Sequence, residues 1–340
     1  MNILVVGNFY SGAFGLHISE TLKESGHNVF RFEPGFKFSK TSIFGKRWNN
    51  IKYAVYNDLL TKIPAVHKKN LKPLFNIIKQ NEINLTIVLH DYLTSEEIKK
   101  IKESTKSPVV LWFPDAFSNF KKSMFFISGY DFLFFVDKYI ADILKADFNL
   151  NTFYLPQACF PKYHHKTVLS ENEKQIYACD ITNAGNMYPS RIALYKQLDK
   201  YDIKMWGNLP PIWAYDKYIN SILQKKFVHH DEKAKAFNGA KIVLNNLHPA
   251  VINGTNKRTF ETTGCGGFLL TKYHPALGDL FEIGKEIETY KNFDDMIEKI
   301  DYYLKHDNER KKIADAGYKR AHKDHTLEIR LNSMLKIIFE

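Results

Sequence analysis

The chain has 340 residues, 44% of them hydrophobic and 25% charged, which is the composition of a globular protein with room for about two domains. Its three cysteines, Cys159, Cys179 and Cys265, lie far apart and form no Cys-x-x-Cys pair, so a disulfide framework and a zinc site are disfavoured and a reducing compartment is favoured. The start M-N-I-L-V-V-G has no signal-peptide pattern, and no apolar run reaches membrane-spanning length, so we expect a cytoplasmic protein.

The formal net charge is +11, and three explanations of it stay open. One is a lysine-rich composition without functional meaning. Another is a surface attracted to anionic lipid headgroups, which would bring the protein into peripheral contact with the inner face of a membrane. The third, nucleic-acid binding, is disfavoured because the positive residues are scattered and no nucleic-acid-binding motif is present.

The first half of the chain predicts a βαβ opening of Rossmann type. Its apolar runs predict strands at Asn2–Val6, Asn28–Phe32, Leu85–Leu89, Val109–Phe113 and Asp131–Val136. Helical patterns cover Leu16–Ser25, Glu96–Glu103 and Lys138–Lys145, and residues 36–72 are less regular, with surface helices and loops. The glycines at positions 7, 12 and 15 do not form the G-x-G-x-x-G fingerprint, so NAD binding is not supported.

A second series of strands and helices begins near Asp180, after a linker near Pro161–Lys174. It predicts strands at Asp180–Ala184, Ile203–Trp206 and Lys241–Asn245, and helices at Ile192–Leu198, Tyr215–Lys225 and Asp231–Asn238. From Asp294 onward the pattern is helical. Two successive Rossmann-like units predict an α/β protein with two such domains.

The segment Asn245–Thr271 is the most informative part of the sequence. It predicts a strand end, a polar loop, a short helix that begins near Asn256, a Gly-Cys-Gly-Gly turn and a further strand at Phe268–Leu270. A helix start directs backbone N–H groups and a positive dipole end outward, which suits a phosphate. Lys257 and Arg258 add positive charge in the first turn, and Glu261, one turn on, can accept two hydrogen bonds from a ribose diol.

This segment resembles the donor site of GT-B glycosyltransferases, especially the group related to spore maturation proteins of the glycosyl transferase group 1 superfamily. The resemblance continues through Leu280–Glu286, Ile300–Leu304 and His325 to Arg330. It implies two Rossmann-like domains that face each other across a cleft. Many retaining members have two glutamates in this loop and helix, separated by seven residues; Glu261 matches the second, which usually holds the ribose, whereas Asn253 stands in the place of the first.

The resemblance implies three parts: an acceptor domain over residues 1–165, a nucleotide-sugar donor domain over 166–325, and a C-terminal helix over 326–340 that packs back on the first domain. A second donor element follows the strand at Asp180–Ala184, where Gly185 and Asn186 lead into a helix start that carries Arg191. His248, at the end of the next strand of this kind, is a candidate contact to the sugar or the phosphate. With Asn253, Lys257, Arg258 and Glu261, these residues form the expected donor site.

Loops that follow strands of the first domain carry the acceptor-side candidates Ser11, Gly12 and His17, and the candidates for a general base, which are His90, Asp91 and Asp115. Each of these residues has the alternative role of a loop residue that caps the next helix. No Asp-x-Asp element stands in a suitable loop, so we expect no metal and no cofactor besides the nucleotide-sugar co-substrate.

The sequence therefore predicts a glycosyltransferase that moves a sugar from a nucleotide donor to a hydroxyl of a glycan, a lipid-linked molecule or a protein, in the synthesis of cell-surface polysaccharide. Two alternatives stay open. One is a non-catalytic sugar-nucleotide-binding or scaffold protein, which Asn253 in place of a glutamate favours. The other is a nucleotide-sugar epimerase, which would need acid and base groups close to the donor sugar.

Overall fold

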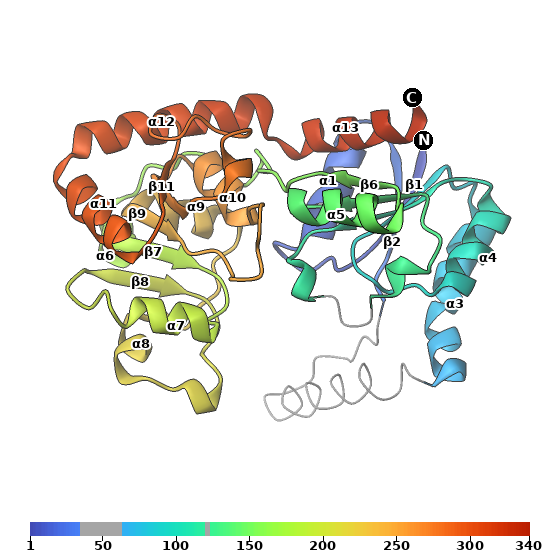
Figure 1. The fold of residues 1–340 in the computed structure, drawn as a ribbon, viewed down its shortest axis with the longest axis horizontal. Helices are drawn as coiled ribbons and strands as arrows, with labels where there is room; N and C mark the ends of the chain where they lie inside the picture. Colours follow the sequence, from blue (N-terminus) through green and yellow to red (C-terminus); the bar gives the residue numbers. More distant parts are fainter. Residues whose placement is uncertain (35–62, 120–122) are drawn as a thin grey trace. The chain divides into compact units, whose positions relative to one another are not determined.

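The computed structural model describes residues 1–34, 63–119 and 123–340 (Figure 1). The chain forms two compact units, residues 1–113 with 120–134 and residues 114–119 with 135–340. Of the less regular segment 36–72, residues 36–62 lie outside the described residues. No helix in the described ranges is both long enough and apolar enough to cross a bilayer.

The first sheet has the strand order β2-β1-β3-β4-β5-β6, and β1 pairs in parallel with both β2 and β3. Its strands are β1 Asn2–Val6, β2 Asn28–Phe32, β3 Leu85–Val88, β4 Val109–Phe113, β5 Phe132–Phe135 and β6 Thr152–Tyr154. The helices of this part of the chain are α1 Phe14–Glu24, α3 Pro64–Gln80, α4 Ser95–Thr105 and α5 Lys138–Phe148. Central strands β3 and β4 are buried along their whole length, as expected for a parallel sheet covered on both faces.

The second sheet has the order β11-β10-β9-β7-β8, and its neighbouring strands are parallel. Its strands are β7 Cys179–Ala184, β8 Ile203–Trp206, β9 Ala240–Asn245, β10 Leu269–Lys272 and β11 Glu288–Tyr290. Its helices are α6 Glu171–Tyr177, α7 Pro189–Tyr195, α8 Lys217–Ile222, α9 His230–Gly239, α10 Lys257–Cys265, α11 Phe293–Lys305, α12 Asp307–Asp324 and α13 Leu327–Phe339. Helix α9 packs on β7 and β9, and α11 packs on β9 and β11.

Local sequence explains where these helices begin and end. The Asn256 side chain accepts a hydrogen bond from the Arg258 backbone N–H and so caps α10, and Gly266, at φ 76°, ends it. The Thr326 side chain caps α13 in the same way, by accepting from the Ile329 N–H.

The predicted α/β class with two parallel sheets is confirmed, and most predicted strands match within a residue or two. Three details were wrong. The predicted Gly-Cys-Gly-Gly turn begins later than expected, because α10 continues through Cys265. The predicted helix at Tyr215–Lys225 is shorter in the structure, where α8 begins after Asp216, whose carboxylate accepts a hydrogen bond from the Ile219 N–H. The predicted linker at Pro161–Lys174 contains the start of α6, which Ser170 and Glu173 cap reciprocally.

All three cysteines are buried and unpaired. Burial raises the pKa of Cys159 and of Cys179 to about 12 in each case, and it raises that of Cys265 as well.

Candidate functional site

The loops that follow β7, β8 and β9 meet at the carboxyl edge of the second sheet. Gly185 directly follows β7, and its N–H donates to the Trp206 carbonyl at the end of β8, 2.8 Å away. Gly207 approaches so closely that a Cβ atom there would lie 2.1 Å from the Gly185 carbonyl oxygen. Parallel sheets bind ligands at this edge, so the contacts around Gly185 define the candidate site.

Two guanidinium groups converge on Gly185. A Cβ atom at this glycine, whose φ is +141°, would lie 2.5 Å from Nη2 of Arg258 and 3.3 Å from Nη1 of Arg191. Only a residue without a side chain fits between them. The predicted donor residues Gly185, Arg191 and Arg258 are thus brought together by two different helices.

Arg191 lies in the first turn of α7, which Pro189 begins, and only 4% of it is exposed. Its Nη1 donates to the Asn186 carbonyl oxygen at 2.6 Å, and its Nε donates to Oδ1 of Asn246 at 3.2 Å. Burial lowers the pKa of this guanidinium. The contacts fix the plane of the group and leave other N–H donors for a ligand.

Arg258 lies in the first turn of α10. Its Nε and Nη2 donate to the Ala184 carbonyl oxygen, and its Nη1 donates to Oδ1 of Asn245 at 3.0 Å. Burial, and then the neighbouring Arg191, lowers the pKa of Arg258 to about 9. No carboxylate of the described residues lies within ion-pair distance of either guanidinium, so an anion bound here would supply the missing negative charge.

Glu261 lies one turn further along α10, within a second charged cluster. Its Oε1 is 2.8 Å from Nζ of Lys233, 3.1 Å from Nζ of Lys257 and 3.7 Å from Nε2 of His164. Its Oε2 accepts no hydrogen bond from the described residues. Burial alone would raise the pKa of Glu261, but Lys233 and Lys257 hold it well below its usual range, so the side chain is a carboxylate.

Burial also affects the protonation of the other residues in the cluster. His164 is 2% exposed and accepts a hydrogen bond from the Phe160 N–H through Nδ1, and burial lowers its pKa to about 3. Burial also lowers the pKa of Lys257. One neutral imidazole, one carboxylate and two lysines give the cluster a surplus of positive charge.

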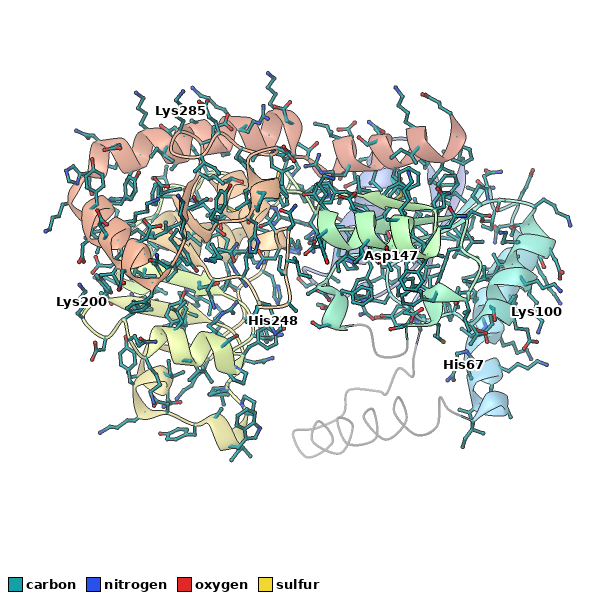
Figure 2. All side chains as sticks on the ribbon, viewed as in Figure 1. His67, Lys100, Asp147, Lys200, His248 and Lys285 are labelled. Atoms are coloured by element: carbon teal, nitrogen blue, oxygen red, sulfur yellow. The ribbon has the colours of Figure 1, made fainter. Side chains whose placement is uncertain are left out.

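The remaining predicted donor residues lie in two places. Asn186 is next to the arginine pair and accepts a hydrogen bond from Asn208 at 3.3 Å through its side-chain oxygen. His248, labelled in Figure 2, is exposed, and its ring meets that of Tyr188 edge-on at 5.7 Å. Tyr188 in turn lies against the Arg191 guanidinium at 6.0 Å, so His248 belongs to the same edge of the sheet.

Asn253 has a structural role that we did not predict. Its backbone N–H donates to both carboxylate oxygens of Asp137 at 3.1 Å, and its side-chain oxygen accepts from the Ala276 N–H at 2.8 Å. This oxygen therefore stabilises the loop, at the position where the sequence resemblance implies a glutamate in many retaining members.

Among the candidates for a general base, Asp91 accepts a hydrogen bond from the Met124 N–H at the start of the 3-10 helix Met124–Phe126, whereas Thr94 caps the next helix, α4. His90 follows β3 and its ring meets Phe113 edge-on at 5.6 Å. Asp115 follows β4 and is exposed.

The acceptor-side candidates differ in exposure. Ser11 is exposed in the turn before α1, and Gly12, next to it, has φ +80°. His17 lies within α1 and is 2% exposed, so its ring is not open to an acceptor in this structure.

Several residues at the site escaped prediction. Asn183 is fully buried and donates to the Leu244 carbonyl at 2.7 Å and to Oδ1 of Asn246 at 3.3 Å. Asn245 is fully buried as well and holds Arg258. The sequence did contain a signal for both asparagines, because polar amides at the ends of apolar strands indicate the ligand-binding edge of a sheet. Lys233 and His164 gave no such signal, because they reach Glu261 from distant parts of the sequence.

The chain thus has two parallel sheets, and two arginines meet at the carboxyl edge of the second. Residues 191–336 match the family model described as Glycosyl transferase-like, a region that contains Arg191, Arg258 and Glu261. The spore protein CgeB of Bacillus subtilis (strain 168) is 26% identical over 250 residues, which cover 68% of this chain and 74% of that protein. The resemblance predicted from the sequence is confirmed: the chain is similar to CgeB and, over residues 191–336, to glycosyl transferase-like proteins.

Solved structures agree on the fold. A glycosyltransferase from Rickettsia africae ESF-5 superposes with a TM-score of 0.66 at 13% identity, over 99% of this chain and 97% of that one. Anabaena Alr3699/HepE, in complex with UDP-glucose, has a TM-score of 0.66 at 10% identity, over 99% of each chain. The fold is therefore GT-B.

Proposed function

We propose that the protein transfers a sugar from a nucleotide-sugar donor to a hydroxyl group of a glycan, a lipid-linked molecule or a protein. The observation that carries the proposal is the convergence of Arg191 and Arg258 on Gly185, without a carboxylate of the described residues to balance them. The similar Anabaena protein, solved with UDP-glucose, supports a nucleotide sugar as the ligand.

The geometry supports a division of labour. The two guanidinium groups bind the diphosphate and stabilise the negative charge that builds on it as the glycosidic bond breaks. The Oε2 atom of Glu261, which accepts no hydrogen bond from the described residues, is available to a ribose hydroxyl, while the two lysines keep the group ionised. Arg258 and Glu261 lie one turn apart in α10, whereas Arg191 reaches the site from α7.

Titration with nucleoside diphosphates tests the binding step. Arg191→Ala and Arg258→Lys should each weaken the affinity for the best-bound nucleoside diphosphate about tenfold or more, because charge-assisted hydrogen bonds are lost, with little change for the uncharged nucleoside. Arg320→Ala is the matched control, since that arginine pairs with Asp324 elsewhere in the same unit. Unchanged diphosphate affinity in both variants would place the site elsewhere.

A non-catalytic sugar-nucleotide-binding protein is the second candidate, and Asn253 favours it. The side-chain oxygen of this residue is bonded to the Ala276 N–H, in a position where many retaining relatives have a glutamate. Release of free nucleoside diphosphate from a panel of nucleotide sugars, with and without acceptor extracts, separates the two. Binding without turnover in every mixture would favour the second candidate.

The general base is proposed to be His90 or Asp115, because the Asp91 carboxylate accepts a hydrogen bond at the start of a short helix. His90→Gln or Asp115→Asn should lower kcat by about a hundredfold or more and leave nucleoside diphosphate binding unchanged, as expected for loss of proton transfer. If both variants keep full kcat, the base is a different residue.

Transfer is also proposed to be independent of metal ions, since guanidinium groups supply the positive charge that a divalent ion gives to other diphosphate sites. Turnover should therefore persist in EDTA. Loss of turnover in chelator that magnesium or manganese restores would contradict this part of the proposal.

A further inference from the structure

The loop between β8 and α8 carries the largest run of exposed apolar side chains in the described part of the second unit. Over the sequence L-P-P-I-W-A-Y, the exposed fractions are 59% for Leu209, 96% for Ile212, 76% for Trp213 and 67% for Tyr215. Isolated exposed apolar residues are common on protein surfaces, but four large ones within seven residues mark an interaction surface.

Both ends of this loop are anchored, so its exposure is a feature of the fold. At its start, Gly207 packs on the Gly185 carbonyl, and the Asn208 side chain donates to that of Asn186. At its end, Asp216 caps α8 and forms an ion pair with Lys196 at 2.8 Å. Two consecutive prolines fix two φ angles within the loop, which reduces the entropy lost when a partner binds.

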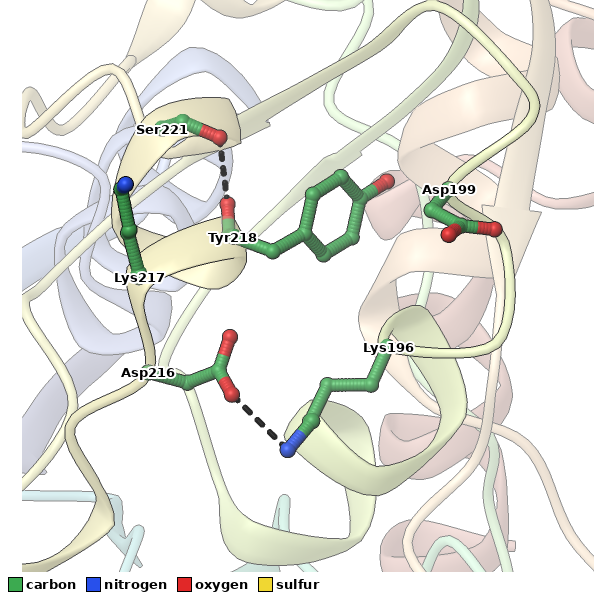
Figure 3. A pocket seen from close by; sticks show the side chains of 6 residues that line it. All are labelled: Lys196, Asp199, Asp216, Lys217, Tyr218 and Ser221. Carbon is green, nitrogen blue, oxygen red and sulfur yellow. Dashed lines mark hydrogen bonds and ion pairs between the residues drawn. The ribbon is translucent and has the colours of Figure 1, made fainter.

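Charged and hydroxyl-bearing residues line the surface beside the loop. A pocket of about 500 Å³ lies between α7 and α8 and is lined by Lys196, Asp199, Asp216, Lys217, Tyr218 and Ser221 (Figure 3). Its two carboxylates balance its two lysines, which distinguishes it from the arginine pair at Gly185. The apolar loop thus lies beside a pocket whose lining side chains carry charged or hydroxyl groups at their ends.

We propose that the Leu209–Tyr215 loop inserts into the surface of an anionic lipid bilayer. Aliphatic residues together with tryptophan and tyrosine are the residues that bury at the boundary of headgroups and acyl chains, where an aromatic ring can lie in the apolar layer with its N–H or O–H in contact with water. The polar residues at the base of the loop then lie at the level of the headgroups.

Charge favours a membrane over a carbohydrate or a protein as the partner. The chain carries a net charge of +11, which attracts anionic lipids, and Lys217, next to the loop, forms no ion pair within the described residues. A carbohydrate-binding surface would pair its aromatic rings with hydrogen-bonding side chains, whereas Tyr215 and Trp213 have the only polar atoms among the side chains of Leu209–Tyr215.

The position of the loop links it to the proposed reaction. Strands β7 and β8 are parallel, so the loop and the Gly185 site leave the second sheet at the same edge. An inserted loop would hold that edge at the lipid surface. Of the glycan, lipid-linked and protein acceptors in the proposed function, on which this step rests, insertion of the loop identifies a lipid-linked molecule.

Vesicle binding tests the insertion without any measurement of turnover. The wild-type protein should sediment with vesicles of phosphatidylcholine and phosphatidylglycerol, and less with phosphatidylcholine alone. In a Trp48→Phe background, Trp213 fluorescence should shift to shorter wavelength on binding, because Trp112 and Trp206 are already buried. Ile212→Ser and Trp213→Ser should each weaken vesicle binding about tenfold or more, since each removes a large apolar group from the bilayer.

Val168→Ser is the matched control, because Val168 is 96% exposed, lies in the same unit and is outside the loop. It should bind vesicles like the wild type. Nucleoside diphosphate affinity should be unchanged in all three variants, so the outcome is independent of the proposed transfer reaction. The proposal is overturned if the wild type binds neither vesicle, or if Ile212→Ser and Trp213→Ser bind like Val168→Ser.

Discussion

At the scale of single residues, Gly185 decides how close the two arginines can come. Its positive φ is unfavourable for other residues, and the Nη2 atom of Arg258 occupies the space of a side chain. The glycine therefore allows both guanidinium groups to lie close to the same stretch of backbone. A site of this kind depends on an absent side chain as much as on those present.

Gly185→Ala should displace the Arg258 guanidinium and lower nucleoside diphosphate affinity by about tenfold or more, with a loss of about 1–3 kcal/mol in the free energy of unfolding. Gly284→Ala is the control, because Gly284 also has a positive φ of +82° but no atom lies within 4 Å of an added Cβ. It should lose stability and keep its affinity. Equal affinity in both variants would show that Arg258 does not contact the diphosphate.

Glu261 gives a second prediction, which concerns both ligand binding and the stability of the fold. Replacing this carboxylate should weaken ribose binding and should also destabilise the fold, since Lys233 and Lys257 lose their buried partner. Glu261→Gln should lower the free energy of unfolding by about 3–5 kcal/mol at neutral pH.

The pH dependence separates this effect from a loss of packing. The folded pKa of Glu261 lies below its ordinary value of 4.5, so its stabilisation is fully present above pH 4.5 and is lost as the pH falls toward the folded pKa. Urea unfolding at several pH values should show the difference between wild type and Glu261→Gln shrinking in acid. A difference that does not change with pH would contradict the ionised pair.

At the scale of elements, the sequence predicted strands better than it predicted the site. Strands such as β4 were found because every residue is apolar and buried. The three-residue strands β6 and β11 were missed because a run so short carries no periodicity. The arginines were predicted from their places at helix starts, but Lys233 was not, because its contact with Glu261 spans two helices and depends on packing.

The start of α10 supports another prediction. Asn256 caps the helix and exchanges hydrogen bonds with Asn245, which in turn holds Arg258. Asn256→Ala should cost about 1–2 kcal/mol of stability and also weaken diphosphate binding, although no charge is removed.

Thr326→Ala is the control for this prediction, because the Thr326 side chain caps α13 in the same way, by accepting a hydrogen bond from the Ile329 N–H, away from Arg191 and Arg258. Urea unfolding and calorimetry on both variants give the comparison. If both lose stability and only Asn256→Ala loses affinity, the cap helps to position Arg258; equal affinities would limit it to a structural role.

At the scale of the whole molecule, two buried histidines make stability depend on pH. Burial lowers the pKa of His164 to about 3 and that of His325 to about 4. His325 accepts a hydrogen bond from Arg330 through Nδ1 and contacts the Leu280 carbonyl through Nε2, so it must be neutral. The folded state therefore binds fewer protons than the unfolded state between these values and 6.5.

The free energy of unfolding should accordingly fall as the pH drops below 6.5, by about 1.4 kcal/mol per pH unit for each histidine until about pH 4. His164→Gln should reduce this slope by about 1.4 kcal/mol per pH unit relative to the wild type when both are unfolded in urea at a series of pH values. An unchanged slope would mean that other groups cause the acid sensitivity.

The burial of all three cysteines has a practical consequence for spectroscopy. Raised pKa values and lack of access to solvent keep native thiols unreactive, because the thiolate is the nucleophile. A fourth cysteine introduced at an exposed position would be the one modified by a maleimide dye or a nitroxide spin label, with no need to remove the natural three. The native chain thus offers a silent background for attaching a single reporter group at a chosen position.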